Sequence, residues 1–586
     1  MCSIIGYVGQ KQAAPLLVDG LKRMEYRGYD SAGVATLTAS GIRIRKGVGK
    51  VAEVNYSQRL DTLPGKVGIG HTRWATHGGV TDFNAHPHSS SSNEIAIVHN
   101  GIIDNYIELR QTLTSQGYTF RSDTDSEVIA NLLQREFERT RNIKNAMMST
   151  LSQLNGKYAF IAIFADGSVA AARFHEPLVI GVGKDSYFVS SDILGFVNNT
   201  DEVIYLDDNE FALIRQQEIS ISDFQGNPTR HQITRVSKEL SDVDKSDYVH
   251  YTLKEIFEQP LTLIRAGATT QLEIDWVAEV LKRPRKVYVT GSGTSFNAAL
   301  IGKYLLSKYA KIDVEPIVSS ETQFSPIHFD KSSLLIALSQ SGESADVLET
   351  VSMAQAGGAE VVSIVNVMTS TLVRMSSISI GLNCGPEIGV AATKSYTSQL
   401  AILYNLADKC SGGKLRLDFE EVSDQISKIL QGQSRIKDIA KQIRGVSDIY
   451  VLGKGIHYFT AMEASLKLKE LPYIHAESLP GGELKHGPLA LLDSNAIVLA
   501  INPRDSTYES MSATAHEVKA RGAKIIGISN VPSPNYDQWI PLPAMEEALY
   551  PLVEMIPIQL LAYYSALERN TNPDYPRNLA KSVTVK

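Results

Sequence analysis

Cys2 follows the initiator methionine directly, so the chain could carry a nucleophile at its own amino terminus. Removal of Met1 is efficient before a small residue, and the mature chain would then begin with a thiol and a free α-amine on one residue. An α-amine with a pKa of about 8 can act as the base that deprotonates the thiol. Taken alone, however, a cysteine at position 2 is more often a chance occurrence than a catalytic group.

Four short motifs that contain glycine or acidic residues follow Cys2 in the first part of the chain. They are YRGYDSAG at 26–33, HTRWATHG at 71–78, HNG at 99–101 and SDTD at 122–125. In this order they resemble the class II glutamine amidotransferases, whose fold is that of the N-terminal-nucleophile hydrolases. The resemblance covers about residues 2–215 and makes Cys2 the expected nucleophile.

This resemblance implies a role for each polar group near Cys2. Cys2 would attack the side-chain amide of glutamine, form a thioester and release ammonia. The Asn100 side chain and the Gly101 N–H would stabilise the oxyanion, because preorganised donors are what a tetrahedral intermediate needs. Arg73 offers a planar fork for the α-carboxylate of glutamine, and Asp125 offers an acceptor for its α-ammonium.

The HTRWATHG motif adds three more expected contributors to the glutamine site. By resemblance, Trp74 closes on the site and shields ammonia, Thr76 contributes to glutamine binding, and His77 organises the loop. His86 and His88 could suggest a metal, but no carboxylate or cysteine has suitable spacing, so we expect no metal site there.

Two loops in the second half of the chain have the composition of a phosphate site. Residues 291–295 (GSGTS) and 339–344 (SQSGES) each lie where a strand-like run turns into a helix. Backbone N–H groups at a helix start, together with short hydroxyls, can bind phosphate, although serine and threonine are also ordinary helix caps. The second string resembles the SIS (sugar isomerase) domain, which binds phosphosugars. The residues expected to bind sugar phosphate here are Thr294, Ser295, Ser339, Gln340, Ser341 and Ser344.

Glu463, Lys467 and Glu470 are spaced to share one helix face, where the ordinary expectation is a solvated stripe of ion pairs. The segments that follow, LPYIHAE at 471–477, GGELKHGP at 481–488 and the tail from Pro576 to Lys586, change that expectation. Together with the earlier motifs they resemble the isomerizing glutamine–fructose-6-phosphate aminotransferases, in their bacterial-type form, over essentially the whole chain.

The resemblance implies the chemistry of the sugar half. Lys581 would form a Schiff base with the C2 ketone of fructose 6-phosphate, and Glu470 would move a proton between C1 and C2. Lys467 would stabilise the charge at O1, and His486 of a neighbouring subunit would assist ring opening. Further sugar contacts are implied for Val390 and Ala580. Because Lys581 itself activates the carbonyl, no cofactor is expected.

The patterns along the chain predict three domains that position these groups. Short β patterns and interleaved helices predict an α+β domain with antiparallel strands at 2–218, and the polar stretch 219–247 is the predicted linker. Beyond it an internal repeat appears, in which Gly291 matches Gly453 at a spacing of 162 residues and Asn366 matches Asn530 at 164. The repeat predicts two tandem doubly wound α/β domains of the SIS kind, at 277–417 and 435–576, followed by a catalytic tail at 577–586.

Composition excludes several classes of protein. With 586 residues, a net charge of −7 and three cysteines, the chain lacks the basic excess of a nucleic-acid binder and the cysteines for disulfides or a thiolate zinc site. The apolar run Leu549–Leu567 contains Pro551, Glu554 and Pro557, which predicts a buried helix and not a membrane span. We therefore expect a cytoplasmic enzyme that binds L-glutamine and fructose 6-phosphate without nucleic acid or membrane, as a homodimer.

Two other functions compete with a synthase. A glutaminase domain fused to a sugar-phosphate isomerase or deaminase would catalyse mainly the breakdown of amino sugars. That reaction would not require Cys2, yet all the predicted residues of the glutamine site are present. A non-catalytic phosphosugar sensor would have lost the acid–base groups, whereas Lys467, Glu470, His486 and Lys581 are all present.

Overall fold

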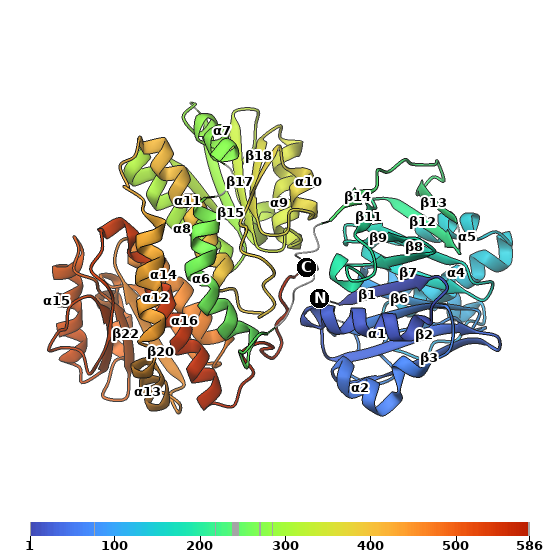
Figure 1. Cartoon of the computed structure of the whole chain (residues 1–586), viewed down its shortest axis with the longest axis horizontal. Helices are drawn as coiled ribbons and strands as arrows, with labels where there is room; N and C mark the ends of the chain where they lie inside the picture. Colours follow the sequence, from blue (N-terminus) through green and yellow to red (C-terminus); the bar gives the residue numbers. More distant parts are fainter. Residues whose placement is uncertain are drawn as a thin grey trace. The chain divides into compact units, whose positions relative to one another are not determined.

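The computed structural model describes residues 2–75, 77–216, 218–236, 245–268, 271–283 and 285–583, and it divides into two compact units. The first unit comprises Met1–Val243 together with Ala580–Lys586, and the second comprises Asp244–Leu579. Each has its own hydrophobic core. Figure 1 shows the helices and strands of both units, coloured along the sequence.

The first unit contains two antiparallel sheets. The larger sheet has the order β14 (Thr234–Arg235), β11 (Glu202–Tyr205), β9 (Val179–Gly183), β10 (Ser186–Ser190), β1 (Ser3–Val8), β4 (Val67–Arg73), β2 (Ser31–Thr38), β3 (Gly41–Val48). The smaller sheet has the order β13 (Glu218–Asp223), β12 (Glu210–Arg215), β8 (Val169–Phe174), β7 (Gly156–Phe164), β6 (Ile95–Ile103), β5 (His88–Ser89). Strands β1, β4, β6 and β7 coincide with the apolar runs IIGYVG, KVGIGHT, EIAIVHNG and YAFIAIF, whose pattern is typical of strands.

The two sheets pack face to face, and helices cover their outer faces. Apolar side chains of both sheets, including Ile4, Ile69 and Ile161, form the inner core. The helices are α1 (Ala13–Met24) and α2 (Val51–Gln58) on the larger sheet, and α3 (Tyr106–Ser115), α4 (Glu127–Thr140) and α5 (Ile143–Leu151) on the smaller one. The result is a helix–sheet–sheet–helix layering, which is an α+β arrangement with antiparallel strands as predicted.

The first half of the predicted linker contains strands that the sequence did not predict. Residues 218–223 form β13, which pairs with β12, and residues 234–235 form β14, which pairs with β11. In β13 the polar residues alternate with Ile219 and Ile221, as expected of an edge strand with one face toward solvent, and the high polarity therefore resembled a linker. Residues 237–244 of the predicted linker lie outside the described residues.

The second unit contains two parallel sheets of the same topology, which confirms the repeat. Their orders are β16 (Val314–Val318), β15 (Lys286–Gly291), β17 (Ser333–Ser339), β18 (Glu360–Val365), β19 (Ile378–Gly381), and β21 (His475–Pro480), β20 (Asp448–Gly453), β22 (Ile497–Ile501), β23 (Lys524–Ser529), β24 (Gln538–Pro541). In both sheets the first strand in sequence lies between the second and the third, so each has a topological switch point at the carboxyl ends of two central strands.

Helices cover both sheets, and several are shared between the two copies. They are α6 (Tyr251–Gly267), α7 (Gln271–Leu281), α8 (Thr294–Leu305), α9 (Ala345–Ala356), α10 (Thr371–Met375), α11 (Lys394–Ser411), α12 (Phe419–Gln431), α13 (Ser434–Gln442), α14 (Ile456–Glu470), α15 (Tyr508–Lys519) and α16 (Tyr550–Glu568). One core cluster takes apolar residues from both sheets and from α8, α11, α14 and α16.

Helix α16 contains nearly all of the apolar run predicted to form a buried helix. Its residues Tyr550 to Ala566 are buried, and Pro557 lies inside the helix instead of ending it. Among the described residues, no helix is long and apolar enough to cross a membrane.

Candidate active sites

Cys2 lies at the start of β1, beside the end of β4. The register pairs Ser3 with Thr72, which brings residue 2 next to the Arg73–Trp74 segment. The Trp74 N–H donates to Cys2 Sγ at 3.2 Å, and the thiol points toward the Trp74 carbonyl at 3.5 Å. Burial raises the pKa of the Cys2 thiol, although the Trp74 N–H and the Arg73 charge act in the opposite direction. The thiol therefore needs a local base before it can attack.

Asn100, one of the two predicted oxyanion donors, lies beside Cys2, the predicted nucleophile. Asn100 lies on β6 and donates from Nδ2 to the carbonyl of Cys2 at 3.1 Å, so the structure brings these two residues together. The second Nδ2 hydrogen remains available to a ligand, since an amide nitrogen carries two. Gly101 has φ of 106°, and a Cβ there would lie 2.0 Å from the carbonyl oxygen of Lys157, so only glycine fits.

Arg73 is buried and organises the loop that follows it. Its guanidinium donates to the carbonyls of His77, Gly78 and Gly79. Burial lowers its pKa, while the nearby Cys2 and Asp30 raise it. These contacts use some of the five N–H donors of the guanidinium. Arg73 would therefore bind a glutamine carboxylate with its remaining donors while it also holds the loop.

The rest of the HTRWATHG motif is anchored by groups the sequence did not single out. Asp30, from the YRGYDSAG motif, accepts the N–H of Ala75 at 2.9 Å. The His77 ring packs edge-to-face on Tyr106, with ring centroids 5.5 Å apart. Thr76 lies outside the described residues.

Asp125 is buried at the end of a hydrogen-bond chain. Its Oδ2 accepts the Ile103 N–H at 2.9 Å, and its Oδ1 accepts the Ser126 hydroxyl at 3.4 Å. Ser126 in turn lies 2.8 Å from Nδ1 of His99, the residue just before Asn100. Neither Ser126 nor His99 was predicted as a site residue, although both adjoin residues that were.

The histidines near this site pack as neutral rings. His71 stacks on His86 with centroids 4.0 Å apart, and His86 contacts His88 at 4.4 Å. Burial lowers the pKa of all three well below the usual 6.5. Uncharged, stacked imidazoles at this position are part of the packing between the strands.

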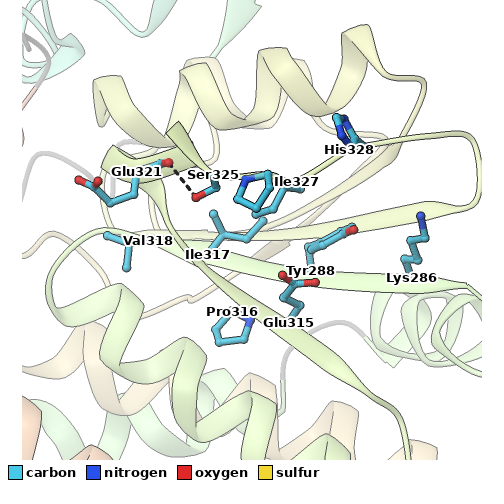
Figure 2. Close-up of a pocket in the computed structure, with 11 residues that line it drawn as sticks. Lys286, Tyr288, Glu315, Pro316, Ile317, Val318, Glu321, Ser325, Ile327 and His328 are labelled. Atoms are coloured by element: carbon cyan, nitrogen blue, oxygen red, sulfur yellow. Dashed lines mark hydrogen bonds between the residues drawn. The ribbon is translucent and has the colours of Figure 1, made fainter. Parts of the chain in front are cut away.

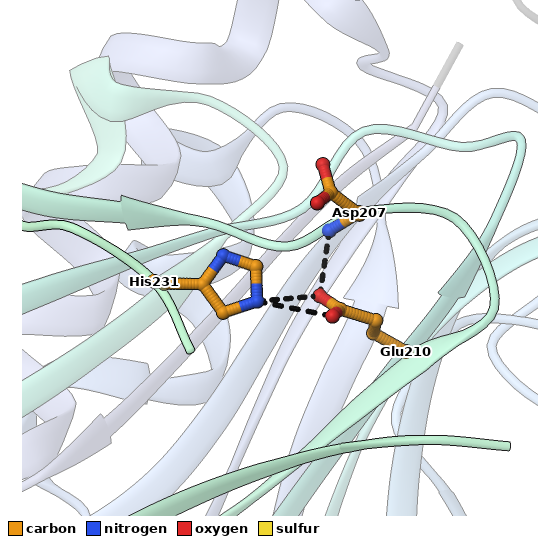
Figure 3. Close-up of side chains that lie close together, drawn as sticks. All are labelled: Asp207, Glu210 and His231. Carbon is orange, nitrogen blue, oxygen red and sulfur yellow. Dashed lines mark hydrogen bonds and ion pairs between the residues drawn. The ribbon is translucent and has the colours of Figure 1, made fainter. Parts of the chain in front are cut away.

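Among the described residues, the histidines and carboxylates that come close enough to share a cation are Asp207, Glu210 and His231 (Figure 3). Glu210 Oε2 accepts the Asp207 N–H at 2.8 Å, and His231 Nε2 lies 2.9 Å from Oε2 and 3.0 Å from Oε1. Both carboxylate oxygens are thus engaged by nitrogens of the protein. The arrangement fixes the turn between β11 and β12, and none of the three was a predicted site residue.

The two predicted phosphate loops meet at the switch point of the first parallel sheet. The 291–295 loop follows β15, the 339–344 loop follows β17, and these strands are neighbours in the sheet. Ligands of open α/β sheets bind at such a point. In the second loop Ser339 Oγ accepts the Gly342 N–H at 2.9 Å and Ser341 Oγ accepts the Glu343 N–H at 3.2 Å, so the loop is preformed.

The remaining residues of these loops also have defined places. Gln340 accepts the Asn366 N–H at its carbonyl, and Ser344 is the N-cap residue of α9. Ser295 Oγ accepts from Gln399 at 2.9 Å, while the Thr294 hydroxyl donates to Glu463 at 2.9 Å.

Lys467 and Glu470 form a close ion pair on α14. Lys467 Nζ lies 2.5 Å from Glu470 Oε2 and 3.4 Å from Glu463 Oε1. Lys467 and Glu463 are fully buried, which excludes the solvated stripe. Burial lowers the pKa of Lys467, but the two carboxylates outweigh this effect and the net pKa is raised.

Two buried carboxylates that sequence reasoning missed shape the loop around Val390. Glu387 accepts the N–H groups of Thr393 and Ser395, and Glu255 accepts that of Gly389. Glu387 lies within the loop itself, so its position near Val390 in the sequence is a signal that could have identified it. Glu255 is distant in sequence and gave no signal.

His486 and the tail residues Ala580 and Lys581 have surroundings of their own. His486 is exposed at the end of a 3-10 turn, Glu483–His486. Ala580 and Lys581 are half-buried and belong to the first unit, whereas the sugar loops belong to the second unit.

An open groove of about 420 Å³ runs along the edge strand β16 (Figure 2). Lys286, Tyr288, Glu315 and Pro316 are among its lining residues, and none of the predicted site residues is. Pro316 has no N–H, which limits pairing of a further strand at this edge.

Comparison with known proteins covers the whole chain. A family model of the glutamine amidotransferase domain matches residues 71–198, and the SIS domain model matches 280–408 and 442–569. The glutamine–fructose-6-phosphate aminotransferase (isomerizing) of Pyrococcus horikoshii is 43% identical over 599 residues, and that of Clostridium tetani is 39% identical over 615 residues. Both matches cover all of this chain and all of the relative.

Solved structures resemble the second unit. The C-terminal domain of glucosamine-fructose-6-phosphate aminotransferase from Francisella tularensis is 34% identical, with a TM-score of 0.52, and matches 57% of this chain and 100% of that one. Tagatose-6-phosphate ketose/aldose isomerase from Escherichia coli is 21% identical, with a TM-score of 0.50, and matches 56% of this chain and 95% of that one, which shows a shared fold. An amidotransferase domain followed by two SIS domains is therefore confirmed.

Proposed function

The chain belongs to the family of isomerizing glutamine–fructose-6-phosphate aminotransferases, and from this we propose that it makes glucosamine 6-phosphate and glutamate from fructose 6-phosphate and L-glutamine. This is the first step of hexosamine synthesis. The observation that carries the proposal is that one chain holds Cys2 against Asn100 and also buries Lys467 against Glu470. The first pair suits glutamine hydrolysis, and the second suits proton transfer on a sugar.

In the glutamine half, Cys2 Sγ attacks the amide carbon of glutamine. Once Met1 is removed, the α-amine accepts the thiol proton and returns it to the leaving ammonia. The free Nδ2 hydrogen of Asn100 and the Gly101 N–H stabilise the oxyanion. Water then hydrolyses the thioester and releases glutamate.

The remaining residues of the first site bind and enclose glutamine in this proposal. Arg73 pairs with the α-carboxylate and Asp125 with the α-ammonium, a division supported by the burial of both charged side chains. Trp74, whose N–H already contacts Cys2, encloses the site, with Thr76 and His77 in the same loop.

In the sugar half, the phosphate lies at the switch point of the first parallel sheet. Its contacts come from the two loops that contain Thr294, Ser295, Ser339, Gln340, Ser341 and Ser344. Val390 and Ala580 contact the sugar through their backbone. The support is geometric: both loops follow adjacent strand ends and start helices.

The sugar chemistry proceeds through an imine. His486 of a neighbouring subunit assists ring opening, which suits its exposure on its own chain. Lys581 Nζ condenses with the C2 ketone and releases water, and ammonia then displaces the lysine. Glu470 takes the C1 proton and delivers it to C2, while Lys467 stabilises the charge at O1. The product is a 2-amino aldose, and no external redox partner or cofactor is required.

A role for His486 across subunits requires at least a homodimer, which is part of the proposal. So are a cytoplasmic location, the absence of nucleic-acid and membrane partners, and the domain boundaries 2–218, 277–417 and 435–576 with a catalytic tail at 577–586.

The proposal is tested by incubating the purified protein with both substrates and measuring glucosamine 6-phosphate and glutamate. The wild type should make both in equal amounts. Cys2→Ala should abolish glutamine use and keep sugar isomerisation, whereas Lys581→Ala should abolish amino-sugar formation and keep some glutamine hydrolysis. Cys410→Ala, far from the first site in sequence, serves as the matched control and should behave as wild type.

Glutamate without amino sugar from the wild type would overturn the synthase function and favour a fused isomerase or deaminase. Binding of the sugar phosphate without any turnover would favour a sensor. Full synthesis by Lys581→Ala would refute the Schiff-base assignment alone.

A further inference from the structure

Glu463 is the one member of the α14 charged stripe to which the proposed reaction gives no step. It is fully buried and lies one helical turn before Lys467. A buried carboxylate without partners would be costly and would shift toward its neutral form. Burial raises the pKa of Glu463, while the Lys467 ammonium and the donors Asn297 and Thr294 act in the opposite direction and favour its ionised form.

The two oxygens of Glu463 are divided between its partners. Oε1 accepts the Thr294 hydroxyl at 2.9 Å and lies 3.4 Å from Lys467 Nζ. Oε2 accepts Nδ2 of Asn297 at 2.8 Å. Thr294 and Asn297 sit in the first turn of α8, which starts at the first phosphate loop. Glu463 thus joins that loop of the first SIS copy to the helix of the second copy that carries Lys467 and Glu470.

Lys467 stands between two carboxylates because of this arrangement. Its Nζ is 2.5 Å from Glu470 and 3.4 Å from Glu463. If Glu463 lost its charge, the ammonium would pair with Glu470 alone. A carboxylate in an exclusive ion pair is a weaker base, because the positive charge stabilises its ionised form.

We propose that Glu463 is a positioning residue for the isomerisation: it holds Lys467 so that Glu470 stays an effective base, and it ties this pair to the phosphate loop through Thr294. This inference rests on the proposed function. It also assigns a task to the Thr294 side chain. A hydroxyl has one hydrogen, so while Thr294 donates to Glu463, the loop binds phosphate through its backbone N–H groups and its other hydroxyls.

The test replaces Glu463 by glutamine, which keeps the size and removes the charge. Glu477→Gln is the matched control, because Glu477 is an exposed carboxylate on β21 of the same domain. Initial rates of glucosamine 6-phosphate formation are measured over a range of fructose 6-phosphate at saturating glutamine. We expect Glu463→Gln to lower kcat about 10- to 100-fold and to change the KM for fructose 6-phosphate less than about 3-fold. Glu477→Gln should match the wild type, and sugar-independent glutamine hydrolysis should stay unchanged in both.

The pH profile separates positioning from a general loss of structure. Glu470 and Glu463 on α14 both raise the pKa of Lys467, Glu387 from the loop before α11 adds to this, and Tyr396 on α11 interacts with Glu463. Without the Glu463 charge, Lys467 should lose its proton at lower pH. The alkaline limb of the kcat profile should therefore shift to lower pH in Glu463→Gln and keep its position in Glu477→Gln.

Thr294→Val removes only the hydroxyl that donates to Glu463, and it provides the test if Glu463→Gln does not fold. It should lower kcat more than it raises the KM for fructose 6-phosphate. In the Glu463→Gln, Thr294→Val double variant the two reductions in kcat should not add, because they act through one contact. A Thr294→Val variant that raises KM alone, or a Glu463→Gln variant with wild-type kcat and pH profile, would overturn the positioning role. Failure of the wild type to make glucosamine 6-phosphate would instead overturn the proposed function.

Discussion

Ser126 links the residue proposed to bind the ammonium of glutamine to the strand that carries the proposed oxyanion donors. It donates to Asp125 and lies 2.8 Å from His99, next to Asn100. All four side chains are buried, so an unpaired group created among them would cost about 1–3 kcal/mol. A change at Ser126 should therefore weaken glutamine binding without altering the surroundings of the Cys2 thiol.

We expect Ser126→Ala to raise the KM for glutamine about 10-fold, since Asp125 loses a donor that fixes its carboxylate. Isomerisation of fructose 6-phosphate to glucose 6-phosphate, which does not use glutamine, should not change. Steady-state glutaminase kinetics measure the effect, with the exposed Ser115→Ala on α3 as control. An unchanged KM for glutamine in Ser126→Ala would show that Asp125 is held without this chain.

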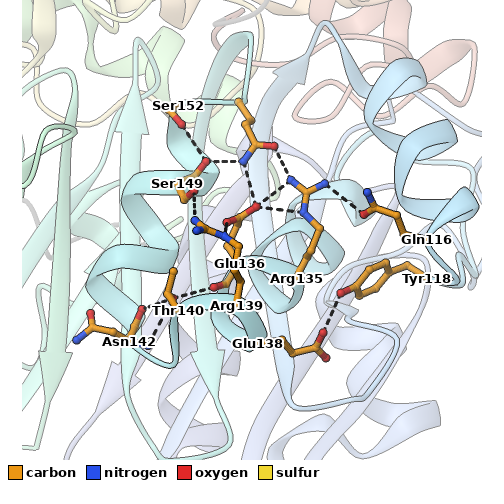
Figure 4. Close-up of polar contacts among 11 residues, drawn as sticks. Gln116, Tyr118, Arg135, Glu136, Glu138, Arg139, Thr140, Asn142, Ser149 and Ser152 are labelled. Atoms are coloured by element: carbon orange, nitrogen blue, oxygen red, sulfur yellow. Dashed lines mark hydrogen bonds and ion pairs between the residues drawn. The ribbon is translucent and has the colours of Figure 1, made fainter.

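At the scale of elements, α4 and α5 cover the sheet that carries Asn100, and a polar network joins them. Glu136 on α4 accepts from Arg139 at 2.8 Å, from Arg135 at 2.9 Å and from Gln153 at 3.3 Å (Figure 4). Burial alone would raise the pKa of Glu136, but these donors, with Ser149, lower it to about 2. The network therefore stabilises the ionised carboxylate.

Because the folded pKa lies below the usual 4.5, this contribution is present above about pH 4.5 and is lost as the pH falls toward about 2. Glu136→Gln should destabilise the α4–α5 pair by about 1–3 kcal/mol at pH 7, and the difference from wild type should shrink at pH 3. Hydrogen exchange of the α4 amides at both pH values measures this local stability. Glu108→Gln, a change of an exposed carboxylate on α3, should not alter the exchange of the α4 amides, and a pH-independent difference at Glu136 would contradict the argument.

The elements that position the sites were largely predictable, because buried strands and glycine-rich turns leave strong local patterns. The run before Ser339 is apolar on both faces, as expected of a central parallel strand. The contact between Thr294 and Glu463 joins residues 169 positions apart, and no local pattern encodes it. Ser126, Glu255 and Glu387 were missed for a similar reason: each supports a backbone or side chain whose position depends on the folded chain.

At the scale of the molecule, the two units are built on independent cores. Among the described residues, the inner core of the first unit is formed by side chains between residues 4 and 214, and the large core cluster of the second unit by side chains between residues 256 and 566. A unit with its own core can fold as a domain. The match of a separate C-terminal domain from Francisella tularensis to 57% of this chain, with all of that domain covered, supports the same view.

Residues 248–586 expressed alone should therefore fold, bind fructose 6-phosphate and isomerise it to glucose 6-phosphate, but they should not use glutamine. Residues 1–247 alone should hydrolyse glutamine to glutamate, because Cys2, Arg73, Asn100 and Asp125 all lie within them. Circular dichroism and the two separate assays check these outcomes, and mixing the fragments should not restore the wild-type rate of amino-sugar synthesis, since ammonia released by one fragment is diluted in the solvent. Full synthesis from the mixture at low fragment concentration would show that covalent linkage is not needed for ammonia transfer.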